Sequence, residues 1–359
     1  MSDDAESFAL SSADSRKRRV GRRLAVLAAT LAVVVPLLVP QISEGAIAAP
    51  VIATAFDPGT PSPVISVSPV ILSAPGRGED LQVRVSAPIN GQRLPVILFA
   101  HGNGQSSEGY APLVNYWAAH GFVVIQPTFL DSRMINLSPN DPRASRIWRF
   151  RVEDMKRVLD QLDQVVAAVP GLAARVDRSR IAAVGHSYGG ITTGMLLGAR
   201  VIDGSGQKLD LSDPRIRVGV LLSTPGNGGK DLSPFAAQHF PFMNPSFTEM
   251  NRPALVIAGD KDKSSLTTRG PDWFTDPYTF SSGPKCLAVL FGGEHLLGGI
   301  SGYLVTETSD ENPKRVAAVQ ELSWAYLRTA FYPGDPAWVR AQAAVTTSAE
   351  PLGRVECKK

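Results

Sequence analysis

The amino-acid sequence predicts an α/β fold in which helices flank a mostly parallel central sheet. Continuous apolar runs, such as residues 95–100, alternate along the chain with amphipathic patterns, such as residues 147–170. Continuous apolar runs indicate strands buried on both faces, and strands that alternate with helices form mostly parallel sheets. Glycine-rich and polar segments also follow directly after several runs, at the sheet edge where α/β proteins bind their ligands.

Composition and charge narrow the possible functions. The chain has 359 residues, of which 44% are hydrophobic and 19% are charged, and its net charge is +3. A chain of this length can bury a large core. Because no basic face is visible in the sequence, we do not expect nucleic acid as a partner. No group of Cys and His has the spacing of a metal site, so we expect no metal.

The first 48 residues are expected to lie outside the fold. A basic run at residues 15–23 precedes an apolar stretch at residues 24–39, and residues 46–48 have the small side chains of an A-x-A pattern. This order is typical of a signal peptide with cleavage after Ala48. The apolar stretch is shorter than the roughly 20 residues of a spanning helix, and an uncleaved N-terminal anchor is the alternative. We therefore expect a secreted, extracytoplasmic protein, with no stable membrane partner once the peptide is cleaved.

The fold is expected to begin after residues 49–80, a segment rich in Pro, Gly and Ser that we interpret as a linker with a first strand. Residues 81–345 are predicted to form the main domain, and residues 346–359 a C-terminal tail. Residues 81–86 alternate between apolar and polar, as in a half-buried antiparallel strand. The buried strands expected after it are residues 95–100, 122–127, 180–184, 218–223, 254–258 and 286–291, and the expected helices include residues 110–120 and 147–170.

One of these strands runs directly into Gly185-His186-Ser187-Tyr188-Gly189, and a helical pattern of small residues follows. A strand, a sharp turn and a helix in this order are typical of a nucleophile elbow, which holds its serine at strained backbone angles. The two glycines leave room for neighbouring segments to approach closely. Chance supplies such a short pattern easily, so its weight depends on the rest of the chain.

A second strand ends in a glycine-rich loop at residues 101–107. Glycines at a strand end let backbone N–H groups point into a site without a side chain in the way. Acyl transfer needs two such donors for the oxyanion of its tetrahedral intermediate. We assign these donors to the N–H groups of Asn103 and Tyr188, the residue after the serine.

Two later strands end in the other groups that a nucleophilic serine needs. Asp260 and Asp262 follow one strand, and His295 follows the next. The serine hydroxyl attacks an ester only when a base takes its proton, and an imidazole suits this step near neutral pH. A buried carboxylate fixes the tautomer of that imidazole. The sequence therefore predicts a triad of Ser187, His295 and an aspartate, with His239 as the only rival base.

Two irregular segments, residues 128–146 and 224–253, are expected to shape the substrate pocket. The second is aromatic and is interpreted as a small cap over the site. We expect Trp148, Phe240 and Phe242 to contact the substrate, although a helix-face Trp is more often packed in a core.

The motifs at residues 99–104, 151–160 and 185–190 together resemble the α/β-hydrolase superfamily, and within it the dienelactone hydrolase-like and platelet-activating-factor acetylhydrolase-like esterases. Secreted cutinase-type polyester hydrolases are similar in layout, including a late-chain disulfide. The resemblance implies that residues 81–345 are an α/β-hydrolase catalytic domain and that Asp262, rather than Asp260, completes the triad. Dienelactone hydrolases use a cysteine nucleophile, so the serine here does not imply their substrate.

Only two cysteines, Cys286 and Cys357, are present. In an oxidising compartment they can pair, and closing this loop would stabilise the fold by roughly 4 kcal/mol in the chain-entropy model. The alternative is two unpaired thiols.

These observations predict an exported serine esterase that forms an acyl-enzyme and needs no cofactor. Its expected partner is a small-molecule, lipid or polymeric ester. An exported acyltransferase with the same triad is the alternative. The two reactions differ only in whether water or an acceptor alcohol attacks the acyl-enzyme. A non-catalytic binding protein on a hydrolase scaffold is a third possibility, which the complete triad opposes.

Overall fold

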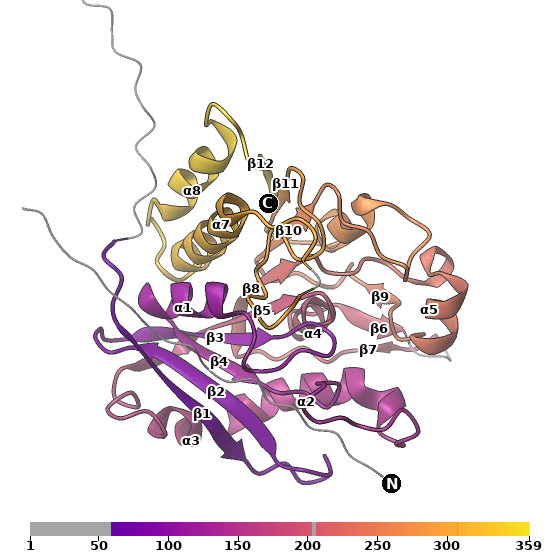
Figure 1. The fold of residues 1–359 in the computed structure, drawn as a ribbon, viewed down its shortest axis with the longest axis horizontal. Helices are drawn as coiled ribbons and strands as arrows, with labels where there is room; N and C mark the ends of the chain where they lie inside the picture. Colours follow the sequence, from indigo (N-terminus) through magenta and orange to yellow (C-terminus); the bar gives the residue numbers. More distant parts are fainter. Residues whose placement is uncertain (1–58, 203–205, 307) are drawn as a thin grey trace, which may run out of the picture. The chain divides into compact units, whose positions relative to one another are not determined.

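A nine-stranded sheet in the order β1-β2-β4-β3-β5-β8-β10-β11-β12 forms the centre of the fold (Figure 1). Neighbouring strands from β4 to β11 in this order are parallel, whereas β1, β2 and β12 pair antiparallel at the two edges. The predicted α/β class with a mostly parallel sheet is therefore confirmed. The strands are β1 (Val64–Leu72), β2 (Leu81–Pro88), β3 (Leu94–Ala100), β4 (Val123–Pro127), β5 (Val176–His186), β8 (Ile216–Leu222), β10 (Ala254–Gly259), β11 (Lys285–Leu290) and β12 (Gly353–Lys358).

The computed structural model describes residues 59–202, 206–306 and 308–359. Its contacts divide the chain into residues 1–50 and residues 51–359, and every described element belongs to the second unit. The predicted signal peptide lies outside the described residues. None of the described helices is long and apolar enough to span a membrane.

Helices cover both faces of the sheet and bury two separate hydrophobic cores (Figure 1). Along β3, Leu98 faces the core under α2 and α4, and Phe99 faces the core under α1 and α7. Burial on both faces explains why the central strands are continuous apolar runs. The helices on the first face are α2 (Ile147–Asp160), α3 (Leu162–Ala167) and α4 (Tyr188–Leu196), and those on the second face are α1 (Ala111–Ala119), α7 (Pro313–Phe331) and α8 (Ala337–Thr346).

The segment at residues 224–253 folds into short pieces beside the carboxyl end of the sheet. Its strand β9 (Pro245–Ser246) pairs with β6 (Arg200–Ile202), which also pairs with β7 (Lys208–Leu209). This small second sheet anchors the predicted cap. The remaining elements are α5 (Pro234–His239), α6 (Asp276–Thr279) and the 3₁₀ turns η1 (Ala144–Arg146), η2 (Gly229–Asp231) and η3 (Pro271–Thr275).

Two expected elements differ from the structure. The helix predicted over residues 147–170 is divided at Gln161, whose backbone leaves the helical region (φ −109°, ψ 23°) and whose side chain donates a hydrogen bond to Ser73 O at 2.9 Å. The predicted C-terminal tail, residues 346–359, is not a tail: it contains β12, which completes the sheet beside β11. Half-exposed polar residues on this edge strand hid it from the apolar pattern.

This correction places the two cysteines together. Cys286 on β11 and Cys357 on β12 are directly opposite in the antiparallel register, with their sulfur atoms 2.03 Å apart. The pair is therefore capable of the predicted disulfide, and neither thiol lies in a frayed end.

Candidate active site

Ser187 occupies the sharp turn between β5 and α4, with backbone angles φ 53° and ψ −118°. Neighbouring backbone segments approach this turn so closely that only glycine fits two residues before and two residues after Ser187. A Cβ on Gly185 would lie 2.1 Å from the carbonyl oxygen of Gly189, and a Cβ on Gly189 would lie 1.9 Å from that of Ala100. These contacts explain both glycines of the predicted elbow and present the serine side chain at the carboxyl edge of the sheet.

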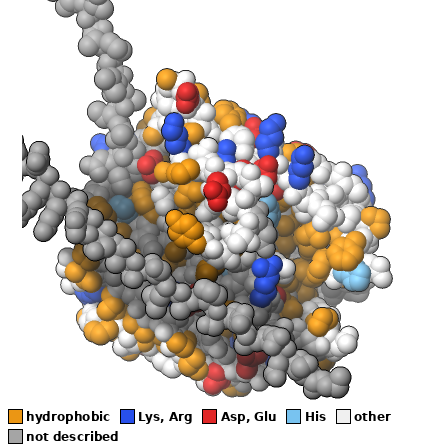
Figure 2. All heavy atoms as spheres, viewed as in Figure 1, with side chains coloured by type: hydrophobic (Ala, Val, Ile, Leu, Met, Phe, Trp, Pro, Cys, Tyr) orange, Lys and Arg blue, Asp and Glu red, His pale blue; other side chains and the backbone are white. Residues whose placement is uncertain are grey.

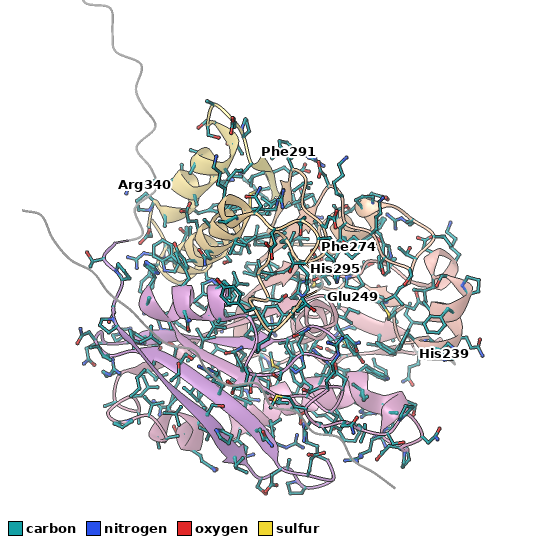
Figure 3. All side chains as sticks on the ribbon, viewed as in Figure 1. His239, Glu249, Phe274, Phe291, His295 and Arg340 are labelled. Carbon is teal, nitrogen blue, oxygen red and sulfur yellow. A yellow bond between two sulfur atoms is a disulfide. The ribbon has the colours of Figure 1, made fainter. Side chains whose placement is uncertain are left out.

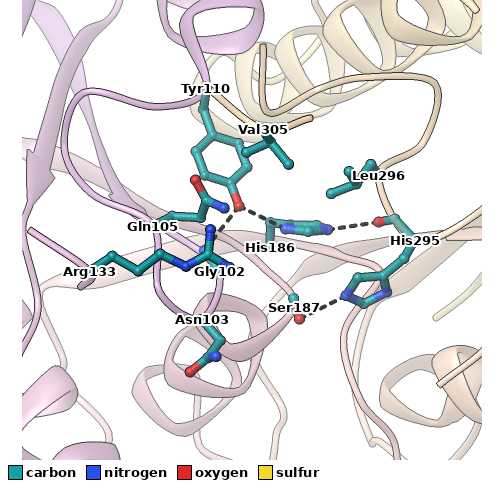
Figure 4. Close-up of a pocket in the computed structure, with 10 residues that line it drawn as sticks. All are labelled: Gly102, Asn103, Gln105, Tyr110, Arg133, His186, Ser187, His295, Leu296 and Val305. Atoms are coloured by element: carbon teal, nitrogen blue, oxygen red, sulfur yellow. Dashed lines mark hydrogen bonds between the residues drawn. The ribbon is translucent and has the colours of Figure 1, made fainter. Parts of the chain in front are cut away.

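Three side chains from three different strand ends meet at this edge. His295 Nε2 is 2.9 Å from Ser187 Oγ, as Figure 4 shows, and His295 Nδ1 is 3.1 Å from both carboxylate oxygens of Asp262. Asp260 instead accepts a hydrogen bond from the N–H of Gly292 at 2.7 Å. The structure therefore brings the expected Ser187, His295 and Asp262 together and gives Asp260 a position in a turn.

The surroundings of Asp262 suit a carboxylate that orients a histidine. Its side chain is fully buried, and burial raises its pKa, while the hydrogen bond with His295 opposes that rise. A carboxylate can only accept, so the Nδ1 of His295 carries the proton of this bond. His295 Nε2 is then left as the acceptor for the hydroxyl proton of Ser187, which is the arrangement that a general base requires.

Two backbone N–H groups next to Ser187 have no hydrogen-bond acceptor among the described residues. Gly102 N–H donates to the Tyr110 hydroxyl at 3.0 Å, and Gly104 N–H donates to Asp131 at 3.1 Å. The N–H of Asn103 between them, and that of Tyr188 at the start of α4, have no acceptor within the described part of the chain. Unused N–H groups of this kind are what an oxyanion hole supplies.

A buried arginine supports both donor segments. Arg151 on α2 donates to both carboxylate oxygens of Asp131 at 2.7 Å, and Asp131 in turn accepts from Gly104. The Arg151 guanidinium also lies between the rings of Phe129 and Tyr188, 4.2 and 4.4 Å from their centroids. Sequence reasoning assigned Arg151 no role, because neither its spacing nor its neighbours reveal a partner twenty residues away.

A chain of hydrogen bonds through His186 joins the glycine-rich loop to the loop of the base (Figure 4). The ring of His186 is buried, with Nδ1 2.8 Å from the Tyr110 hydroxyl and Nε2 2.8 Å from the carbonyl oxygen of His295. Burial lowers the pKa of His186 to about 3, so the ring is neutral. Because the His295 carbonyl can only accept, Nε2 carries the proton, and Nδ1 accepts from Tyr110. The sequence indicated no role for His186, because its two hydrogen-bond partners lie 76 and 109 residues away along the polypeptide.

Removing the Tyr110 hydroxyl from this series of hydrogen bonds should slow turnover with little effect on KM. We expect Tyr110→Phe to lower kcat about tenfold, because the lost hydroxyl leaves Gly102 N–H and His186 Nδ1 without their partner beside the site. Tyr116→Phe, on the helix α1 that begins directly after Tyr110, is the matched control, since its buried hydroxyl has no partner among the described residues. Steady-state kinetics of both variants check this expectation. Equal kcat values for the two variants would contradict it.

Two cavities meet at Ser187 and Asn103. The smaller, of about 150 Å³, is apolar, and the larger, of about 270 Å³, is the one drawn in Figure 4. The smaller is also lined by Tyr188, Ile191, Pro225, Phe240, Phe242, Met243 and Leu266, and the larger by Gly102, Gln105, Tyr110, Arg133, His186, His295, Leu296 and Val305. Most of these residues stand on irregular loops, where sequence periodicity carries no information.

The aromatic residues expected at the substrate divide into two groups. Phe240 and Phe242 line the smaller cavity. Trp148 does not: it stacks on the ring of Phe242, at 6.0 Å between centroids and 15° between planes, and packs against the core. The expectation that Trp148 contacts the substrate is corrected by this position, because Phe242 stands between Trp148 and the cavity.

The rival base, His239, lies apart from the triad (Figure 3). It stands on α5, and its ring packs 4.5 Å from that of Phe235. Phe235 is 58% exposed, and hydrophobic side chains gather in this part of the surface (Figure 2). Within the described residues, no three His, Cys, Asp or Glu side chains cluster as metal ligands would.

The chain belongs to the alpha/beta hydrolase family. The model of this family matches residues 97–353, which contain all the site residues described above. No curated protein matches the chain. Family membership supports a hydrolase-type function, and the chemistry of the particular site must come from its own geometry.

Proposed function

We propose that this protein is an exported serine hydrolase of carboxyl esters that works through an acyl-enzyme. The observation that carries the proposal is the hydrogen-bonded series Ser187–His295–Asp262 beside two unused backbone N–H groups. The N-terminal sequence pattern and the disulfide-capable cysteine pair support export.

In the proposed reaction, His295 Nε2 takes the hydroxyl proton as Ser187 Oγ bonds to the ester carbonyl carbon. The negative charge on the carbonyl oxygen is stabilised by the N–H groups of Asn103 and Tyr188. The bond to the alcohol oxygen then breaks, and His295 gives that oxygen its proton. Water attacks the acyl-enzyme by the same steps and releases the acid.

The position of His295 indicates which cavity would take the acyl chain of the ester and which would take its alcohol. The leaving alcohol must lie near His295, which donates its proton, and His295 lines the larger cavity but not the smaller one. The acyl chain therefore occupies the smaller, apolar cavity behind Tyr188. The small volume of this cavity favours short acyl chains, because a longer chain would have to displace packed side chains such as Phe242 and Met243.

A panel of p-nitrophenyl esters tests both the proposed ester hydrolysis and the assignment of the smaller cavity to the acyl chain. We expect kcat/KM to be highest for acetate or butyrate and to fall at least tenfold for palmitate. Phe242→Ala should move the optimum towards longer chains, whereas Trp148→Phe, behind it, should not. Failure to hydrolyse any ester would exclude the proposed activity, and a palmitate optimum would exclude the assignment of the cavity.

A further inference from the structure

The loop after β11 that carries His295 is fastened to the segment before α7 by a single carboxylate oxygen. Asp310 Oδ2 accepts hydrogen bonds from the backbone N–H groups of Glu294 at 2.9 Å and Gly298 at 3.1 Å, which lie on either side of His295. The same oxygen accepts from Arg315 Nη1 at 2.8 Å. Asp310 therefore holds both sides of the turn that presents the base.

Arg315, on the first turn of α7, fixes Asp310 and the beginning of this loop at the same time. Its guanidinium donates to the carbonyl oxygen of Phe291 at 3.1 and 3.3 Å and to the backbone carbonyl oxygen of Asp310 at 2.9 Å. The two side chains of the ion pair are only 9% and 7% exposed. Charge-assisted bonds that are shielded from water in this way are stronger than those at a surface.

Only one of the two carboxylate oxygens of Asp310 is used. Oδ1 is buried and has no hydrogen-bond partner among the described residues. The Asp310→Asn side chain can therefore place its amide oxygen where Oδ2 lies and keep all three acceptor bonds, with the amide nitrogen in the place of Oδ1. Asp310→Ala has no acceptor to offer.

Asp310 lies near the triad but outside the space for the substrate. Burial raises the pKa of Asp262, the hydrogen bond with His295 lowers it, and the negative charge of Asp310 adds to the rise. Neither Asp310 nor Arg315 is among the residues that line the two cavities at Ser187. A change at Asp310 should thus reach the reaction only through the base.

We propose that Asp310, held by Arg315, is a positioning residue that keeps His295 Nε2 within reach of Ser187 Oγ. The proposal rests on the proposed ester hydrolysis, in which His295 takes the hydroxyl proton over a distance of 2.9 Å. A displacement of about 1 Å at a reacting group can cost on the order of a hundredfold in rate. Such a displacement slows proton transfer and leaves the substrate cavities unchanged.

Steady-state kinetics with p-nitrophenyl butyrate test the proposal on two variants at this position. Asp310→Ala should lower kcat by about a hundredfold with KM within twofold of the wild type, because the loop of the base loses its acceptor. Asp310→Asn should keep kcat within about threefold, because the amide oxygen still accepts and the lost charge favours an ionised Asp262. A role limited to stability would not divide the two variants by kcat alone.

The matched control is Asp335→Ala, beyond the other end of α7. Asp335 also accepts from a backbone N–H, that of Ala337 at 2.9 Å, and from an arginine of α7, Arg328 Nε at 2.6 Å. Thermal unfolding should show that both alanine variants are less stable than the wild type. The control should nevertheless keep kcat within twofold, since its contacts lie between α7 and α8.

The outcomes separate this inference from the one on which it rests. Unchanged kcat in Asp310→Ala, an equal loss in Asp335→Ala, or an equal loss in Asp310→Asn would each overturn the positioning role and leave the esterase intact. If Asp310→Ala does not fold, Arg315→Met tests the same contact, with an expected loss in kcat of about tenfold at unchanged KM. Unchanged kcat in Arg315→Met would then overturn the role. No ester hydrolysis by the wild type would overturn both proposals.

Discussion

Ser187→Ala should lower kcat for ester hydrolysis by on the order of 10⁶-fold, as removal of a triad nucleophile does in serine hydrolases. Without Oγ no acyl-enzyme can form, whereas the elbow backbone and its two glycines are unchanged. The melting temperature should therefore stay within a few degrees of the wild type. Kinetics with p-nitrophenyl butyrate and thermal unfolding measured on the same preparation check both parts.

A covalent probe makes this result specific to the residue. A fluorophosphonate should add once to the wild type, at Ser187, and not to Ser187→Ala, as intact and peptide mass spectrometry can show. Full turnover by the variant, or labelling at another serine, would move the nucleophile elsewhere and remove the proposed mechanism.

Asp262→Asn should lower kcat by on the order of 10⁴-fold, the cost measured when a triad aspartate becomes an amide. The Asn side chain can donate a hydrogen bond to His295 Nδ1, which places the imidazole proton on Nε2 and removes the acceptor for the Ser187 hydroxyl. The matched control is Asp260→Asn, two residues away. Asp260 only accepts from Gly292 N–H, so this variant should keep kcat within about threefold, since an amide oxygen can still accept. Loss of activity in Asp260→Asn with an active Asp262→Asn would reverse the assignment.

Much of the fold was predictable because its signals are local. Strands covered on both faces must be apolar at consecutive positions, so β3, β8, β10 and β11 stood out within a residue or two of their ends. The edge strand β12 could not be predicted in this way, because the charged residues Glu356 and Lys358 interrupt any apolar run. Its pairing with β11 depends on a partner about seventy residues away, and no local pattern records that.

The same distinction applies within the site. Asp262 and His295 could be expected next to Ser187 because all three follow parallel strands, whose carboxyl ends share one edge. The neighbours of that triad follow no such rule. Arg151 on α2 pairs with Asp131 in the loop after β4, and His186 at the end of β5 meets Tyr110 just before α1.

The sequence by itself determined the class of fold, the residues that could form a triad and the expected chemistry of a serine nucleophile, since strand burial and order along the chain encode them. Only the tertiary structure decided which aspartate contacts His295, that Trp148 stands behind Phe242, and that two cavities meet at Ser187. Cavities are shaped by side chains from segments far apart in the chain. Their walls therefore exist only after the chain has folded.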